Sequence, residues 1–267
     1  MNQLINKILF ASKITAGLPS FVSLLWHSKK LRWSKTGFIK AKPTSRPVCI
    51  KINQQDTERE LFLRTFDGDI DIFFEIFWKK IYELPQLDPA NIKTIIDLGA
   101  NIGLSALYFL NSYPNANLFC VEPEHSNFEL LSQNLLLEIN SGKAKAIELA
   151  VMGQDGNVSF TSASAKYNSK VLANGGEKKT KAVSMTTLLK LFAIDHIDLL
   201  KVDVEGAEKY IFSADTEWLN KVDNVIIEVH SIEDREICMK AFSHYHFTVM
   251  PVNVDPANEN LFWARKI

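Results

Sequence analysis

The sequence is poor in the features that mark several common classes of protein. Its three cysteines are odd in number and widely scattered, and no two of them have the spacing of metal ligands. We therefore expect a reducing compartment, no disulfide framework and no metal site. No run of about 20 nearly uninterrupted apolar residues is present, because Lys7, Lys13, Gly17 and Pro19 interrupt the apolar start of the chain. These absences predict a cytoplasmic protein without a spanning helix or a cleaved signal.

Acidic residues are missing from the first 55 positions. This segment holds ten Lys or Arg, whereas the rest of the chain carries 20 basic and 31 acidic residues. The net charge of the whole chain is only −1, so the composition predicts no nucleic-acid partner. We therefore expect two parts, a basic N-terminal helical extension with its linker at 1–55 and a catalytic domain at 56–267.

The N-terminal extension has an amphipathic pattern. Apolar residues recur at roughly helical spacing from Leu4 to Leu25, with an expected break at Pro19, and Trp26 and Trp33 follow among basic residues. Such a helix can lie on an anionic membrane surface, at the inner face of the membrane. It can equally pack against the main domain or a second subunit. Peripheral membrane attachment and self-association both stay open for this segment.

The stretch TIIDLGANIG, residues Thr94–Gly103, indicates a ligand-binding turn. Its β-branched start favours a strand, which ends at Asp97 and meets Gly99 and Gly103 at the start of a helical pattern. In open α/β sheets, ligands bind where a strand ends and a helix begins, because amides and a closely approaching backbone are available there. The stretch therefore predicts a cofactor site.

Strand-like and helix-like segments alternate after this stretch. A polar, lysine-rich segment at 161–181 is predicted to be a loop, and the last two strands are close enough to form an antiparallel hairpin. The alternation predicts an α/β fold with a doubly wound, mostly parallel sheet. The expected strands are 118–122, 144–151, 158–160, 197–204, 224–230, 246–252 and 261–266, and the expected helices include 104–111, 125–139 and 233–242.

The residues of the turn favour one cofactor over another. A nicotinamide fingerprint needs glycines at positions 99, 101 and 104, but the chain has Asn101 and Leu104 at the second and third of these. Asp97 would also repel a pyrophosphate, whereas it suits the amino group and sulfonium of S-adenosylmethionine. Glu122 ends the next strand, where an acid can accept hydrogen bonds from both ribose hydroxyls.

Several separate motifs follow one another along the chain. They are the Arg64–Asp69 cluster, DLGANIG at 97–103, VEPE at 121–124, LAV followed by DG at 149–156, KVDVEGAE at 201–208 and IIEVH at 226–230. Together they resemble the FkbM-type class I methyltransferases. The resemblance implies a seven-stranded Rossmann-like methyltransferase sheet, S-adenosylmethionine as methyl donor, and usually a hydroxyl as acceptor.

Motif matching also implies which residues hold the cofactor. Gly99, Ala100, Asn101 and Gly103 would surround its methionyl part, with Asp97 beside them. The ribose would meet Glu122 and Pro123, and the adenine would meet Ala150 and Val151. Asp203, at the end of a later strand, completes this set of cofactor-binding residues.

The catalytic candidates follow two later strands. Asp203, Glu205 and Glu208 place three acids within six residues at the carboxyl end of a buried strand. We expect Asp203 to lie nearest the sulfonium and the acceptor, with Glu205 as a candidate base and Glu208 stabilising the next helix. His230 ends the adjacent strand and is an alternative base.

These observations predict an S-adenosylmethionine-dependent methyltransferase acting on a hydroxyl of a sugar, a glycan or another small metabolite. A nicotinamide-dependent oxidoreductase on a Rossmann fold is one alternative. A non-catalytic cofactor-binding or scaffolding protein is another.

Overall fold

The computed structural model describes residues 2–38, 40, 46–54, 57–162, 169–172, 178–252 and 259–267. Contacts between residues divide the chain into an N-terminal unit, which ends at Lys80, and a C-terminal unit, which begins at Ile81. Each unit is described by itself. None of the helices in the described part of the chain has the length and apolar character needed to cross a membrane.

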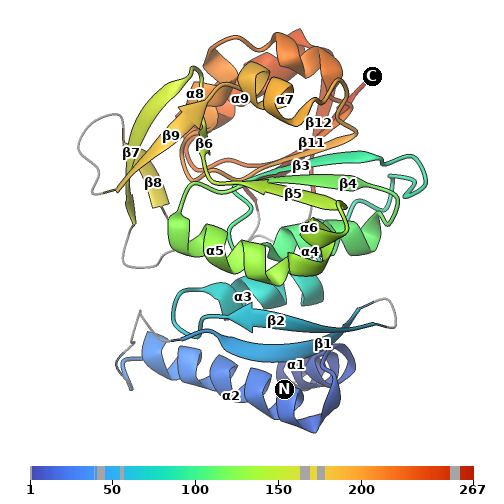
Figure 1. Cartoon of the computed structure of the whole chain (residues 1–267), viewed down its shortest axis with the longest axis vertical. Coiled ribbons are helices and arrows are strands. Elements are labelled where there is room, and N and C mark those ends of the chain that lie inside the picture. The colour runs from blue at the N-terminus through green and yellow to red at the C-terminus, as the bar shows by residue number, and fades with distance from the viewer. Residues whose placement is uncertain are drawn as a thin grey trace. The chain divides into compact units, whose positions relative to one another are not determined.

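The N-terminal unit combines two helices with a β-hairpin (Figure 1). The helix break lies at Thr15 and Ala16 rather than at the predicted Pro19. Pro19 stands in the first turn of the second helix, where backbone N–H groups have no intrahelical acceptor and the ring is tolerated. The elements are α1 (Asn2–Ile14), α2 (Gly17–Lys35), β1 (Val48–Gln54), β2 (Thr57–Leu63), α3 (Asp69–Phe73) and the π-helix η1 (Phe74–Trp78).

The hairpin extends this unit past residue 55, where the charge pattern placed the domain boundary. Strands β1 and β2 pair antiparallel, from Val48 opposite Leu63 to Gln54 opposite Thr57. The basic and acidic sides of the charge boundary therefore belong to one ladder of hydrogen bonds. The predicted division into an extension at 1–55 and a catalytic domain at 56–267 stays a prediction.

An ion pair fixes the turn that leads into α3. The Arg64 side chain donates to both carboxylate oxygens of Asp69, at 2.8 and 2.9 Å, and the Arg64 backbone N–H donates to one of them at 2.8 Å. Both residues are buried. These charge-assisted bonds pair the Arg64 guanidinium with the Asp69 carboxylate, so the two opposite charges stabilise each other inside the unit.

The C-terminal unit contains the predicted seven-stranded sheet (Figure 1). Strands β3, β4, β5, β10 and β11 pair in parallel. The last two strands, β12 and β13, form the predicted antiparallel hairpin, and β13 also pairs antiparallel with β11. The strand order is β12-β13-β11-β10-β3-β4-β5. The strands are β3 (Thr94–Leu98), β4 (Asn117–Val121), β5 (Ala144–Ile147), β10 (Leu199–Val202), β11 (Asn224–Glu228), β12 (Phe247–Pro251) and β13 (Leu261–Lys266).

Helices cover both faces of this sheet. Figure 1 shows α4, α5 and α6 below it and α7, α8 and α9 above it. The helix predicted at 125–139 is interrupted at Leu135. The helices are α4 (Leu104–Ser112), α5 (His125–Asn134), α6 (Leu136–Asn140), α7 (Met185–Phe192), α8 (Glu208–Ser213), the 3-10 helix η2 (Glu217–Lys221) and α9 (Ile232–His244).

The order of the strands creates a switch point between β3 and β10. The chain runs outward from β3 through β4 to β5, and then returns to β10 on the other side of β3. In the parallel register, Lys201 lies opposite Asp97 and Val202 opposite Leu98. Loops that leave such a switch point diverge to opposite faces and open a crevice at the carboxyl edge.

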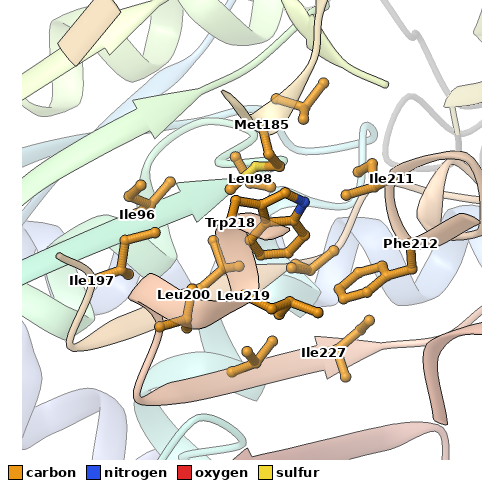
Figure 2. Packing of buried hydrophobic residues seen from close by; sticks show 14 of the residues in the cluster. Ile96, Leu98, Met185, Ile197, Leu200, Ile211, Phe212, Trp218, Leu219 and Ile227 are labelled. Atoms are coloured by element: carbon orange, nitrogen blue, oxygen red, sulfur yellow. The ribbon is translucent and has the colours of Figure 1, made fainter. Parts of the chain in front are cut away.

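The upper face of the sheet carries a large apolar core. In Figure 2, Ile96, Leu200 and Ile227 from neighbouring strands lie around Trp218 of η2 and Phe212 of α8. The Phe212 and Trp218 rings meet edge to face, with centroids 5.5 Å apart. This packing holds the ends of β10 and β11 at fixed positions.

A second sheet replaces part of the sequence prediction. Residues 144–151 were expected to form one strand. Strand β4 ends at Val121, opposite Ile147, so β4 offers no strand pairing to the residues after Ile147. Ala150 pairs instead with Ala182. This sheet has the order β6-β9-β7-β8, with β6 (Ala150–Val151), β7 (Gly156–Ser162), β8 (Ser169–Leu172) and β9 (Lys178–Val183).

The loop predicted at 161–181 is wrong where the structure describes it. The described residues belong to β7, β8 and β9, which pair antiparallel. Residues 163–168 and 173–177 lie outside the described part of the chain. Polar and lysine-rich composition favoured a loop, but cross-strand pairing of the backbone can form with polar side chains on a half-exposed sheet.

Candidate active site

Gly99 brings the loop after β3, where the sequence predicts a cofactor site, against the end of β10. Its φ of 75° is left-handed, and a Cβ added there would lie 1.8 Å from the carbonyl oxygen of Asp203. Only glycine allows this approach of the two backbones. The loop is anchored on its other side, where the Gly99 and Ala100 N–H groups both donate to the Val121 carbonyl oxygen, at 3.0 and 3.1 Å.

Asn101 and Glu122 join the loop to the end of β4. The Asn101 backbone, with a φ of 50°, donates its N–H to one carboxylate oxygen of Glu122 at 2.8 Å. The Glu124 N–H donates to the other oxygen at 2.9 Å. Burial raises the pKa of Glu122 to about 7, although these hydrogen bonds oppose the rise. Above that pH the carboxylate is charged and remains a strong acceptor.

The other predicted cofactor residues lie at the start of α4, after β4 and in β6. Gly103 has a φ of 87° and begins α4. Pro123 follows Glu122 and is partly exposed, whereas Ala100 is buried in the loop. Ala150 and Val151 are buried in β6. The assignment of these residues to a cofactor stays a prediction.

Asp97 has partners inside the protein. It is completely buried, and its carboxylate accepts from the Ser105 hydroxyl at 2.6 Å and lies 3.1 Å from Lys201 Nζ. The expected role of Asp97 beside the cofactor stays a prediction. Its contacts in the structure give it a positioning role, because they fix the Lys201 ammonium at the switch point.

Lys201 links the two halves of the site. Its Nζ donates to the Gly99 carbonyl oxygen at 2.8 Å and lies 3.5 Å from the Asp203 carboxylate. Burial lowers the pKa of Lys201, but Asp97 and then Asp203 outweigh this effect and keep it above its ordinary value. The ammonium therefore stays charged between the two carboxylates.

Asp203 lies at the centre of the carboxyl edge of the sheet. Its side chain is 24% exposed, and besides Lys201 it meets the Tyr82 hydroxyl, which donates at 3.4 Å. Burial and then the charge of Asp203 raise the pKa of Tyr82 well above its ordinary value. Tyr82 is thus a neutral donor, and Asp203 is a carboxylate held in place by two partners.

His230 is oriented by a buried carboxylate. Its Nδ1 lies 2.7 Å from Glu208, which is completely buried at the start of α8. The opposite ring nitrogen, Nε2, lies 3.3 Å from Glu205 and 3.8 Å from Asp203. An Nδ1–H donated to Glu208 leaves Nε2 as the basic nitrogen when the ring is neutral.

Neighbouring acidic side chains raise the pKa values of His230 and Glu205. Burial lowers the pKa of His230, but the bond to Glu208 and the charge of Asp203 outweigh it and raise the pKa to about 9. Burial, followed by the charge of Asp203, raises the pKa of Glu205 to about 8. Glu205 also has a left-handed φ of 53°, a conformation that few residues other than glycine adopt.

The same three side chains have the spacing of a metal site. One donor atom each from Asp203, Glu205 and His230 lies within 4.8 Å of the others. A second group with this spacing, His196, Asp198 and Asp223, also occurs among the described residues. The sequence-based expectation that the protein has no metal site stays a prediction.

A family comparison decides what kind of protein carries this site. Residues 97–250, more than half of the chain, match the model of the methyltransferase FkbM domain. The chain belongs to the FkbM methyltransferase family. The matched segment begins at Asp97 and includes Glu122, Asp203 and His230.

Named relatives of this FkbM family member agree with the assignment. Methyltransferase sdnD of Sordaria araneosa is 30% identical, over 59% of this chain and 73% of that protein. Hexuronic acid methyltransferase AglP of Haloferax volcanii is 28% identical, over 55% of this chain and 60% of that protein. The crystal structure of methyltransferase FkbM from Methylobacillus flagellatus has a TM-score of 0.52 and 12% identity. That match covers 68% of this chain and 45% of that one, and it supports the fold alone.

Three groups in the FkbM site have roles that the sequence did not predict. Glu208 was expected to stabilise the helix that follows β10, but its carboxylate lies against His230. The position of Lys201 could have been predicted from the sequence, because alternation along a strand puts its side chain on the same face as that of Asp203. The contact of Tyr82 could not have been predicted, because 121 residues separate it from its partner Asp203.

Proposed function

We propose that this FkbM family member transfers a methyl group from S-adenosylmethionine to a hydroxyl of a sugar or another small metabolite. One observation carries the proposal. The cluster of Asp203, Glu205 and His230 adjoins the loop at Gly99, whose backbone touches that of Asp203. A proton-accepting group and a cofactor loop thus share the carboxyl edge of the sheet.

The loop fits the proposed methyl donor. The side-chain oxygen of Asn101 is buried and has no hydrogen-bond partner among the described residues, so it is free to accept from a ligand. Gly99 lets the loop lie directly against the Asp203 carbonyl oxygen, which brings Asn101 and Asp203 to the same edge of the sheet. Gly99 and Asn101 would hold the amino acid part, Glu122 the ribose, and Ala150 with Val151 the adenine. When bound, S-adenosylmethionine supplies an electrophilic methyl group on a sulfonium.

His230 is the best proton acceptor in the cluster. One carboxylate oxygen of Asp203 already accepts from the Tyr82 hydroxyl and lies 3.5 Å from Lys201 Nζ, so that oxygen is less accessible to an acceptor hydroxyl. His230 has its Nδ1 fixed by Glu208 and presents Nε2 toward the acids. The neighbouring carboxylates raise the pKa of His230. The sulfonium of bound S-adenosylmethionine would place a positive charge beside Asp203, which would lower the pKa of His230 and leave Nε2 free to accept the hydroxyl proton.

A sugar acceptor is supported by one relative. The Haloferax volcanii protein is named as a hexuronic acid methyltransferase, and we extend that class of acceptor to this chain as part of the proposal. The test is incubation with isotopically labelled S-adenosylmethionine and a panel of sugars, glycans and small metabolites, followed by mass spectrometry. Label on a hydroxyl oxygen supports the proposal, whereas label on nitrogen or on no acceptor counts against it.

Cofactor binding gives a first quantitative prediction. Replacing Glu122 with alanine removes the acceptors proposed for the ribose hydroxyls, and we expect S-adenosylmethionine affinity to fall about 10- to 100-fold, as for lost charge-assisted hydrogen bonds. Isothermal titration calorimetry measures this change. Glu129→Ala, an exposed acid on α5, is the matched control and should bind normally. Preferred binding of NAD would refute the cofactor assignment.

The pH dependence of activity tests the Glu208–His230 pair. The pKa of His230 is about 9 without the donor, and the donor's positive charge would lower it, so kcat/KM for the acceptor should rise with pH and level off below that value. Glu208→Gln removes the negative charge that raises this pKa, so we expect the rise to move to lower pH while the plateau falls. Glu233→Gln, which alters an exposed partner of Lys209, is the control. An unchanged profile in Glu208→Gln would contradict the positioning role of Glu208.

A further inference from the structure

Helices α1 and α2 of the N-terminal unit have apolar outer faces. We define the apolar stripe as Leu4, Ile5, Ile8 and Leu9 of α1 with Leu18, Val22 and Trp26 of α2. Their exposed fractions run from 38% at Ile8 to 72% at Leu18. Helices on the surface of a soluble protein normally bury their apolar residues, so the exposure of this stripe is unusual.

Helical geometry shows that the stripe is a true outer face. In α1 its members are spaced i, i+1, i+4 and i+5, so they lie on one side of the helix, and Ala11 at the edge of that side is buried. In α2 they are spaced i, i+4 and i+8, while Leu24 and Leu31 are buried opposite them. Both helices contact β1. The unit therefore already has an inner apolar core, and the stripe is additional to it.

Basic and aromatic side chains adjoin the stripe on α2. The rings of Trp26 and Trp33 meet edge to face with centroids 6.0 Å apart. Lys29 Nζ lies 4.7 Å from the centre of the Trp33 ring, and Lys30 Nζ lies 5.4 Å from that of Trp26. Tryptophan and lysine together favour the boundary between lipid acyl chains and headgroups.

We propose that the apolar stripe docks the N-terminal unit on an anionic lipid surface. Charge complementarity favours this occupant over a second copy of the chain. Residues 1–55 contain ten Lys or Arg and no acidic residue, so two copies would bring positive surfaces together. Anionic headgroups instead attract each nearby basic side chain, while the stripe enters the region between headgroups and acyl chains.

The test is sedimentation of the full-length protein with phosphatidylcholine vesicles that contain or lack phosphatidylglycerol. We expect strong binding only to the anionic vesicles. A triple variant of the stripe, Leu4→Ser, Ile8→Ser and Leu18→Ser, should bind about 100-fold more weakly. A charge variant, Lys29→Gln, Lys30→Gln and Arg32→Gln, should lose about 100-fold toward anionic vesicles at low salt.

Matched controls separate docking from general surface hydrophobicity. Leu137→Ser, Leu191→Ser and Ile232→Ser remove equally exposed apolar side chains from the C-terminal unit and should leave vesicle binding unchanged. Circular dichroism checks that each variant is folded. Absence of binding by the wild-type protein, or equal loss in the control variant, would overturn the proposal. So would a lipid-free dimer in analytical ultracentrifugation that the stripe variant dissociates.

Discussion

Replacing His230 with alanine is expected to lower the rate of methyl transfer about 100- to 1000-fold, within the usual range for loss of a general base. The variant keeps Asp203 and Glu205, but it lacks the nitrogen that lies 3.3 Å from Glu205 and is oriented by Glu208. Cofactor affinity should change little, because in the described part of the chain the imidazole contacts Glu208, Glu205 and Asp203 and makes no hydrogen bond to the Gly99 loop. Single-turnover assays with labelled donor measure the chemical step directly.

His196 offers a matched control for this variant. Its Nε2 lies 3.0 Å from Asp223 and 3.4 Å from Asp198, so it is also a histidine between two acids. It precedes β10, at the opposite end of that strand from Asp203. His196→Ala should therefore retain full activity. Full activity in His230→Ala would eliminate His230 as the base and leave Asp203 and Glu205 to be tested by Asp203→Ala and Glu205→Gln.

The position of the site could be predicted because parallel strands align their carboxyl ends. Asp97, Glu122, Asp203 and His230 each lie at or just beyond the end of a buried strand, and a doubly wound sheet gathers such ends at one edge. Their pairing could not be predicted. The bond between Glu208 and His230 depends on how the first turn of α8 faces the end of β11, which no local pattern encodes.

The fold was predictable where strands are buried on both faces. Runs such as Leu199–Val202 are apolar apart from a single lysine, and this pattern is typical of a central parallel strand. The break after Ile147 was not predictable, since it depends on where the neighbouring strand β4 ends. Residues 178–183 were also missed, because their strand is stabilised by backbone pairing with β7 and not by an apolar pattern.

Replacing Lys201 with methionine is expected to reduce the free energy of unfolding by about 3 to 5 kcal/mol, the usual cost of leaving a buried charge without its partner. Asp97 is completely buried and lies 3.1 Å from the Lys201 ammonium, which is itself only 2% exposed. Methionine fills similar space but cannot donate to Asp97 or to the Gly99 carbonyl oxygen. Chemical denaturation followed by circular dichroism measures the loss.

Two further variants show whether the buried charge is the cause. Lys209→Met breaks a similar pair with Glu233 at an exposed position, and it should cost less than about 1 kcal/mol. Adding Asp97→Asn to Lys201→Met removes the buried Asp97 charge that the first substitution leaves without a partner, so part of the free energy of unfolding should be regained. A loss in Lys201→Met as small as that in Lys209→Met would contradict this account. Lys201 also donates to the Gly99 loop and lies beside Asp203, and the double variant lacks both contacts. We therefore expect it to regain stability without regaining cofactor affinity. This result would separate the structural role of Lys201 from its role in joining the two halves of the site.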